Sequence, residues 1–131
     1  MKVKKYTQSH EEWLLISEEE IKLAKKAILG DDIIVIPTVF LAQQAAEKAF
    51  KAYLTSVGMP FRKTHDLVDL LERCMERDAE FEYLLDLALN LNPYVSRCRY
   101  PDDCFTIPDL ESVERCIFEA QKILDFVKQK I

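Results

Sequence analysis

The sequence predicts an all-α fold, an up-down-up-down four-helix bundle with an extra short helix before the last helix. The 131 residues include only two glycines and five prolines, which is unfavourable for an all-β chain with many turns. Apolar residues make up 49% of the chain and recur at spacings of three and four, as on the buried face of a helix. This length suits one domain, so we expect residues 1–131 to form a single helical domain.

The first helix is expected to begin at Ser9, because Ser9 and Glu12 have the spacing of a capping box. Gly30 is a suitable C-terminal cap. Glu20 lies in the middle of the apolar face of this helix. Either the helix rotates until Glu20 reaches solvent, or Glu20 is a partly buried carboxylate that needs a cationic or hydrogen-bonding partner.

The second helix is expected from Pro37 or Thr38 to Ser56, and it has two unlike faces. One face is a stripe with little side-chain bulk, which lets neighbouring helices approach closely, and it contains Ala42, Ala45, Ala46, Ala49, Ala52 and Tyr53. The other face is polar and contains Gln44, Glu47, Lys48 and Lys51. The preceding run, residues 33–36, has strand-like composition but no second strand to pair with, so we interpret it as a loop or a first helical turn.

Thr64 is expected to cap a third helix, and Asp78 to break it before a shorter helix that carries Phe81 to Leu91. The last helix is expected to begin at Pro108, a favourable first helical position. Its apolar seam has a 3-4-3-4 spacing typical of antiparallel bundles and contains Leu110, Val113, Ile117, Ala120, Leu124, Val127 and Ile131. Three apolar residues off this seam predict a partner surface: Phe118, Ile123 and Phe126.

Composition excludes several classes of function. A net charge of −5 argues against binding nucleic acid by bulk charge, although a local basic site remains compatible with it. The cysteines form no Cys-x-x-Cys pair and have no zinc-ligand spacing with the histidines. Cys74 and Cys116 lie on predicted apolar faces, whereas Cys98 and Cys104 could approach one another across a loop. Without a signal-peptide core or a membrane-length apolar run, the expected location is the cytoplasm.

The polar residues between Pro93 and Pro108 are candidates for chemistry. Arg99 precedes the extended Tyr100-Pro101 turn, and its guanidinium fork suits a phosphate or a carboxylate. The alternative is a solvated loop in which Arg99 pairs with Asp102. Glu47 and Lys51 equally suit a surface salt bridge one helical turn apart. His65 suits a local cap, a structural contact or a catalytic base.

Four segments together resemble the HEPN family, the higher eukaryotes and prokaryotes nucleotide-binding domain. They are Trp13 with Glu20, Ile21 and Ala24; QQAAEKAFKAYL at residues 43–54; KTHDL at residues 63–67; and RYPD at residues 99–102. The resemblance implies a helical bundle that usually dimerises and associates with nucleotides or RNA. It also implies a minimal nucleotidyltransferase as partner in prokaryotic toxin–antitoxin pairs.

The resemblance implies that the candidate residues belong to one nucleotide- or RNA-binding site. We expect Glu20, Glu47, Lys51 and Arg99 to converge, with Tyr100 and Asp102 shaping the rim. The further candidates are Gln44, Lys48 and His65. We expect no required cofactor and no metal, with a nucleotide as the candidate ligand.

One departure from the family pattern separates the alternatives. The ribonuclease members have an Arg, four to six residues and then a His before the last helix, but here Cys104 stands where that His is sought. A thiol is a poor replacement for an imidazole in proton transfer. The binding module is therefore favoured over a metal-independent ribonuclease, and a non-catalytic dimeric interaction protein is the third alternative.

We predict a symmetric homodimer in solution, formed through the apolar residues off the seam of the last helix. An isologous helix-pair contact can supply the roughly 1,200–2,000 Å² that specific interfaces bury. Sedimentation velocity at tens of micromolar protein should give the mass of two chains. A monomer at this concentration would contradict the prediction.

We also predict little or no intrinsic ribonuclease activity, because Cys104 replaces the expected histidine. Incubation of the purified chain with single-stranded RNA should leave the RNA intact. The prediction is wrong if cleavage persists after repurification and disappears in the Arg99→Ala variant.

Overall fold

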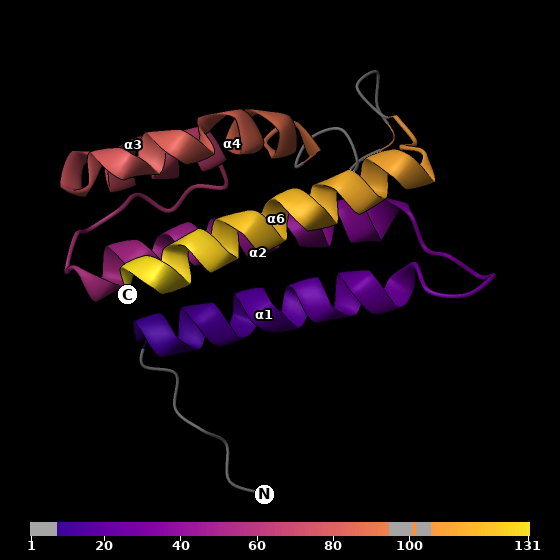
Figure 1. Ribbon diagram of the computed structural model, residues 1–131, viewed down its shortest axis with the longest axis horizontal. Coiled ribbons are helices and arrows are strands. Elements are labelled where there is room, and N and C mark those ends of the chain that lie inside the picture. Colours follow the sequence, from indigo (N-terminus) through magenta and orange to yellow (C-terminus); the bar gives the residue numbers. More distant parts are fainter. Residues whose placement is uncertain (1–7, 95–100, 102–105) are drawn as a thin grey trace, which may run out of the picture.

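The computed structural model describes residues 8–94, 101 and 106–131, and all the regular structure in these residues is helical (Figure 1). The predicted fold class, an all-α bundle, is confirmed. The elements in chain order are α1 (His10–Ala27), α2 (Ile36–Ser56), α3 (Leu67–Arg77), the 3-10 helix η1 (Ala79–Leu84), α4 (Leu85–Leu91) and α6 (Leu110–Lys130). No described helix combines the length and the apolar character that a membrane crossing requires.

Helix α1 begins as the sequence predicts and ends earlier. The Ser9 hydroxyl accepts from the backbone N–H of Glu12 at 3.3 Å, and the Glu12 carboxylate accepts from the Ser9 N–H at 3.1 Å, so the capping box forms. The helix ends at Ala27 with Ile28 as its C-terminal cap. Gly30 instead occupies the following turn with φ 79°, a left-handed conformation that suits glycine.

Helix α2 is the central element, because α1, α3 and α6 all pack against it. The alanines of its small face are fully buried, as predicted. Their lack of bulk lets α1 approach so closely that the Ser17 hydroxyl donates to the backbone carbonyl of Ala45 at 2.7 Å. The strand-like run ends in the first turn of α2, and residues 33–35 have no regular structure.

Between α2 and α6 the chain forms two short antiparallel segments, α3 and the pair η1–α4. Contacts of residue 43 with 65 and of residue 50 with 74 show that α3 runs parallel to α2, whereas the predicted up-down-up-down order would make it antiparallel to α2. This direction arises because residues 57–66 first run back along α2 (Figure 1). The chain then reverses at Asp78, where the predicted break occurs, and η1 and α4 return toward α6.

The cap of α3 differs from the prediction. Asp66, and not Thr64, is the N-cap residue, and its carboxylate accepts from the N–H groups of Val68 and Asp69. Thr64 acts one step earlier, where its hydroxyl accepts from the N–H of Asp66 at 3.0 Å. The carboxylate is the better acceptor for the positive end of the helix dipole.

Helix α6 begins at Leu110, two residues after Pro108, because Asp109 provides the cap. The middle of the predicted seam is buried, while its two ends, Leu110 and Ile131, are exposed. Ile123, predicted to lie on a partner surface, is fully buried in the core, because α1, α2 and α4 together cover a wider face of α6 than a heptad seam. Phe126 packs on Phe81, with ring centroids 5.1 Å apart, and Phe118 is 61% exposed.

Candidate functional site

The centre of the polar face of α2 is the carboxylate of Glu47, a residue that is only 1% exposed. One carboxylate oxygen accepts from the ammonium of Lys51, one turn along the helix, at 2.9 Å. The other lies 2.8 Å from Nδ1 of His65, which comes from the loop before α3. The ammonium of Lys48 lies 4.0 Å from the same carboxylate oxygen that Lys51 contacts. The predicted surface salt bridge is therefore a buried ionic contact that joins α2 to the loop.

The contacts around Glu47 form a polar network, and Glu20 joins this network from α1. Its carboxylate lies 3.6 Å from the ammonium of Lys48, which also donates to the side-chain carbonyl of Gln44 at 3.2 Å. Of the two alternatives for Glu20, the partly buried carboxylate with a cationic partner is the one observed. Burial raises the pKa of Glu20 above its ordinary value of 4.5, while the charge of Lys48 lowers this pKa and that of Glu47 raises it.

Lys51 is covered by two aromatic rings. Its ammonium lies 5.6 Å from the ring centre of Trp13, on α1, and 5.8 Å from that of Phe61, in the loop. The two rings meet edge to face at 6.4 Å, so they close this end of the network between α1 and the loop. Cation–π attraction then partly compensates the desolvation of the ammonium.

His65 is the accessible member of the network, with 54% of its side chain exposed. Its backbone is held firmly, because the buried amide of Gln43 donates to its carbonyl at 2.9 Å. Gln43 is fixed in turn by Gln44, whose amide donates to it at 2.7 Å. Asn92 accepts from the N–H of Leu67 at 2.8 Å and so attaches the start of α3 to the end of α4. The histidine is thus a positioned side chain on the surface, and it does not cap α3.

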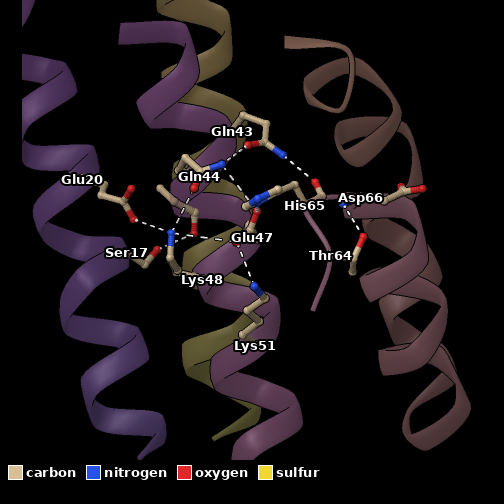
Figure 2. A network of polar contacts seen from close by, with 11 residues as sticks. Ser17, Glu20, Gln43, Gln44, Glu47, Lys48, Lys51, Thr64, His65 and Asp66 are labelled. Carbon is tan, nitrogen blue, oxygen red and sulfur yellow. Dashed lines mark hydrogen bonds and ion pairs between the residues drawn. The ribbon is translucent and has the colours of Figure 1, made fainter. Parts of the chain in front are cut away.

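Six of the nine candidate residues lie in this one network (Figure 2): Glu20, Gln44, Glu47, Lys48, Lys51 and His65. The other three, Arg99, Tyr100 and Asp102, lie outside the described residues, as do Cys98 and Cys104. The convergence of Arg99 on the site therefore stays a prediction.

Sequence reasoning missed residues that support the network. Gln43 stands beside Gln44 at the edge of the small face, and its pairing with a loop carbonyl depends on the path of that loop. Trp13 and Phe61 belong to segments far apart in sequence, so no local spacing indicates that they meet over Lys51. A further buried carboxylate, Glu119 of α6, accepts from the amide of Asn90 at 2.8 Å away from this network.

A hollow of about 450 Å³ lies between the loop and α3 and is lined by Pro60, Phe61, Arg62, Asp69, Leu70 and Arg73. Its two guanidinium groups already have partners. Arg62 pairs with Asp69 at 2.9 Å, and Arg73 donates to the carbonyl of Pro60 at 3.0 Å and pairs with Glu76. Among the described residues no cluster of side chains is suited to a metal ion.

The fold and the network define a small helical module with a buried ionic site on its central helix. Comparison with family models matches residues 10–130 to the HEPN domain, and the chain belongs to this family. The predicted resemblance is confirmed. A comparison with curated proteins gives no significant match.

Two solved structures are similar over nearly the whole chain. The crystal structure of TT1696 from Thermus thermophilus is 29% identical, with a TM-score of 0.79, over 95% of this chain and 100% of that one. The crystal structure of ST0689, an archaeal HEPN homologue, is 28% identical, with a TM-score of 0.70, over 93% of this chain and 97% of that one.

The raised pKa of Glu20 predicts a specific pH dependence of stability. The folded chain binds this proton more tightly than the unfolded chain, so the resulting stabilisation is complete below the unfolded value of 4.5 and is lost as the pH rises through the folded pKa. Glu20→Gln cannot titrate. Urea denaturation between about pH 4 and about pH 7 should show the free energy of unfolding of this variant rising relative to wild type.

Glu19→Gln, at an exposed neighbouring position, is the matched control for removing one negative charge from α1. Parallel pH profiles of Glu20→Gln and wild type would show that Glu20 is not desolvated as described.

The buried pair of Glu47 and Lys51 predicts strong coupling between the two residues. Glu47→Leu leaves the ammonium of Lys51 buried without its carboxylate, and this should cost about 3–5 kcal/mol in the free energy of unfolding. The double variant with Lys51→Met should recover much of that loss, because no unpaired charge remains. A double-mutant cycle by urea denaturation measures the coupling, with Glu72→Leu at an exposed site as control. Additive effects would contradict a direct buried pair.

Proposed function

We propose that this chain is a nucleotide-binding or RNA-associated HEPN module. In this proposal it acts as a homodimer and as the partner of a minimal nucleotidyltransferase in a prokaryotic toxin–antitoxin pair. Membership of the HEPN family supports the class of function. The observation that supports the position of the binding site is the buried ionic network of α2, which has one exposed imidazole at its edge.

The energetics of the network favour a binding role over a purely structural one. Burying carboxylates and ammonium groups costs desolvation energy, and apolar side chains of similar size often stabilise such a position equally well or better. Clusters of partly buried ionisable groups are characteristic of functional sites. Here Glu47 holds three basic side chains, Lys48, Lys51 and His65, in fixed positions on one face.

An anionic ligand suits the accessible edge of this network. His65 is exposed there, and the neighbouring Lys63 is exposed on the same loop. Arg99, from the RYPD segment, is the further phosphate-binding residue that the family resemblance implies. A nucleotide phosphate or an RNA backbone supplies the negative charge that these groups attract.

Isothermal titration calorimetry of the full chain with ATP, and separately with a short single-stranded RNA, tests the binding function. Arg99→Ala should weaken binding by well over the ~0–1 kcal/mol of a surface ion pair. Lys26→Ala removes an exposed positive charge from α1 and is the matched control. Unchanged affinity in Arg99→Ala would show that this residue does not bind the ligand and forms only a structural salt bridge.

Co-expression tests the proposed association with a nucleotidyltransferase. A nucleotidyltransferase encoded in a neighbouring reading frame should co-purify with this chain through size-exclusion chromatography. If such a protein elutes separately at micromolar concentrations, the partner proposal fails while nucleotide binding stays open to the calorimetric test.

A further inference from the structure

The charges inside the network balance without the histidine. Two carboxylates, Glu20 and Glu47, face two ammonium groups, Lys48 and Lys51, at separations between 2.9 and 4.0 Å. Each carboxylate has an ammonium partner, so the network does not require a positive imidazole for neutrality. His65 can therefore be neutral while it contacts Glu47.

The contact with Glu47 determines how the ring of His65 is oriented. An ionised carboxylate only accepts hydrogen bonds, so the 2.8 Å contact with ionised Glu47 favours the ring form of His65 that has its hydrogen on Nδ1. In the neutral ring the other nitrogen, Nε2, then has a lone pair. This atom belongs to a side chain that is 54% exposed and whose backbone is held by Gln43.

A lone pair does not bind an anion, but a protonated ring does. Histidine is the side chain that ordinarily changes charge near neutral pH. The charged groups facing it from the elements packed around it are Glu47, Lys48 and Lys51 of α2, Glu20 of α1, and Lys63 and Asp66 of its own loop. Of these, Asp66 is bound to the N-terminus of α3 and to Asn92. His65 is therefore the group positioned to respond when a ligand adds negative charge at this edge.

We propose that a phosphate group binds at Nε2 of His65 and that binding is coupled to the uptake of one proton by the imidazole. The proton comes from solvent, no covalent bond between ligand and protein forms or breaks, and the imidazolium donates from Nδ1 to Glu47 and from Nε2 to a phosphate oxygen. Glu47 acts as the positioning residue. This inference rests on the proposed binding function and names the chemistry of its ligand, the phosphate of a nucleotide or of RNA.

Calorimetry in several buffers tests the coupling directly. The full chain is titrated with AMP, and separately with a 5′-phosphorylated RNA oligonucleotide, at about pH 7.5, where a phosphate monoester is largely dianionic. The slope of the observed enthalpy against the ionisation enthalpy of the buffer counts the protons exchanged, and it should approach one proton taken up. Uptake with AMP identifies a free nucleotide as a sufficient ligand, and uptake with RNA alone identifies RNA.

Variants of the two histidines of the chain provide a matched comparison. His65→Asn should abolish proton uptake and weaken AMP binding roughly tenfold, the loss expected for a charge-assisted hydrogen bond. His10→Asn changes the histidine that pairs with Glu11 on α1 and should leave both quantities unchanged.

Nitrogen NMR of the imidazole in the wild-type chain provides a readout that needs no variant. Free His65 should show a neutral ring with its hydrogen on Nδ1, and AMP should convert it to the doubly protonated ring.

The outcomes separate this inference from the proposed function. Binding without proton uptake, or uptake that persists in His65→Asn, overturns the inference and leaves the binding function in place. If neither AMP, ATP nor the RNA binds, both are wrong.

Discussion

The structure of this HEPN domain depends on the burial of one carboxylate, that of Glu47. A buried ion is tolerated only where hydrogen bonds and opposite charges replace water. Lys51 and His65 supply these contacts, and Lys48 extends them to Glu20 on α1. Three segments that are distant in sequence, namely α1, α2 and the loop before α3, are held in register around this single group.

The two faces of α2 explain why the carboxylate is buried at all. The alanines allow α1 and α6 to approach so closely that α2 is enclosed along most of its length. Its polar side chains then remain near other protein groups even where no helix covers them. Trp13 and Phe61 cover Lys51 at one end, and the loop covers Glu47. An ionic network therefore forms where an isolated helix would have an ordinary solvated face.

The path of the loop concentrates the accessible chemistry of the network in one side chain. Because residues 57–66 run back along α2, they bring His65 over the buried carboxylate and place α3 parallel to α2 (Figure 1). Glu47 and Lys51 are almost inaccessible, whereas the imidazole is largely exposed. A ligand that approaches this face meets the histidine first, and the buried charges act on the ligand through it.

The sequence by itself determined the features that depend on local bonding: the all-helical class, the capping box at Ser9, the break at Asp78 and the seam of the last helix. These follow from spacings within one or two turns, because helical hydrogen bonds join residues four apart. The sequence also placed a carboxylate at position 20 that needed a partner. Only the tertiary structure decided that Glu47 is buried and bound to His65, that Ile123 belongs to the core, and that α3 runs parallel to α2. Each of these depends on which distant segment covers a given helix face, and helical periodicity identifies the face but not its neighbour.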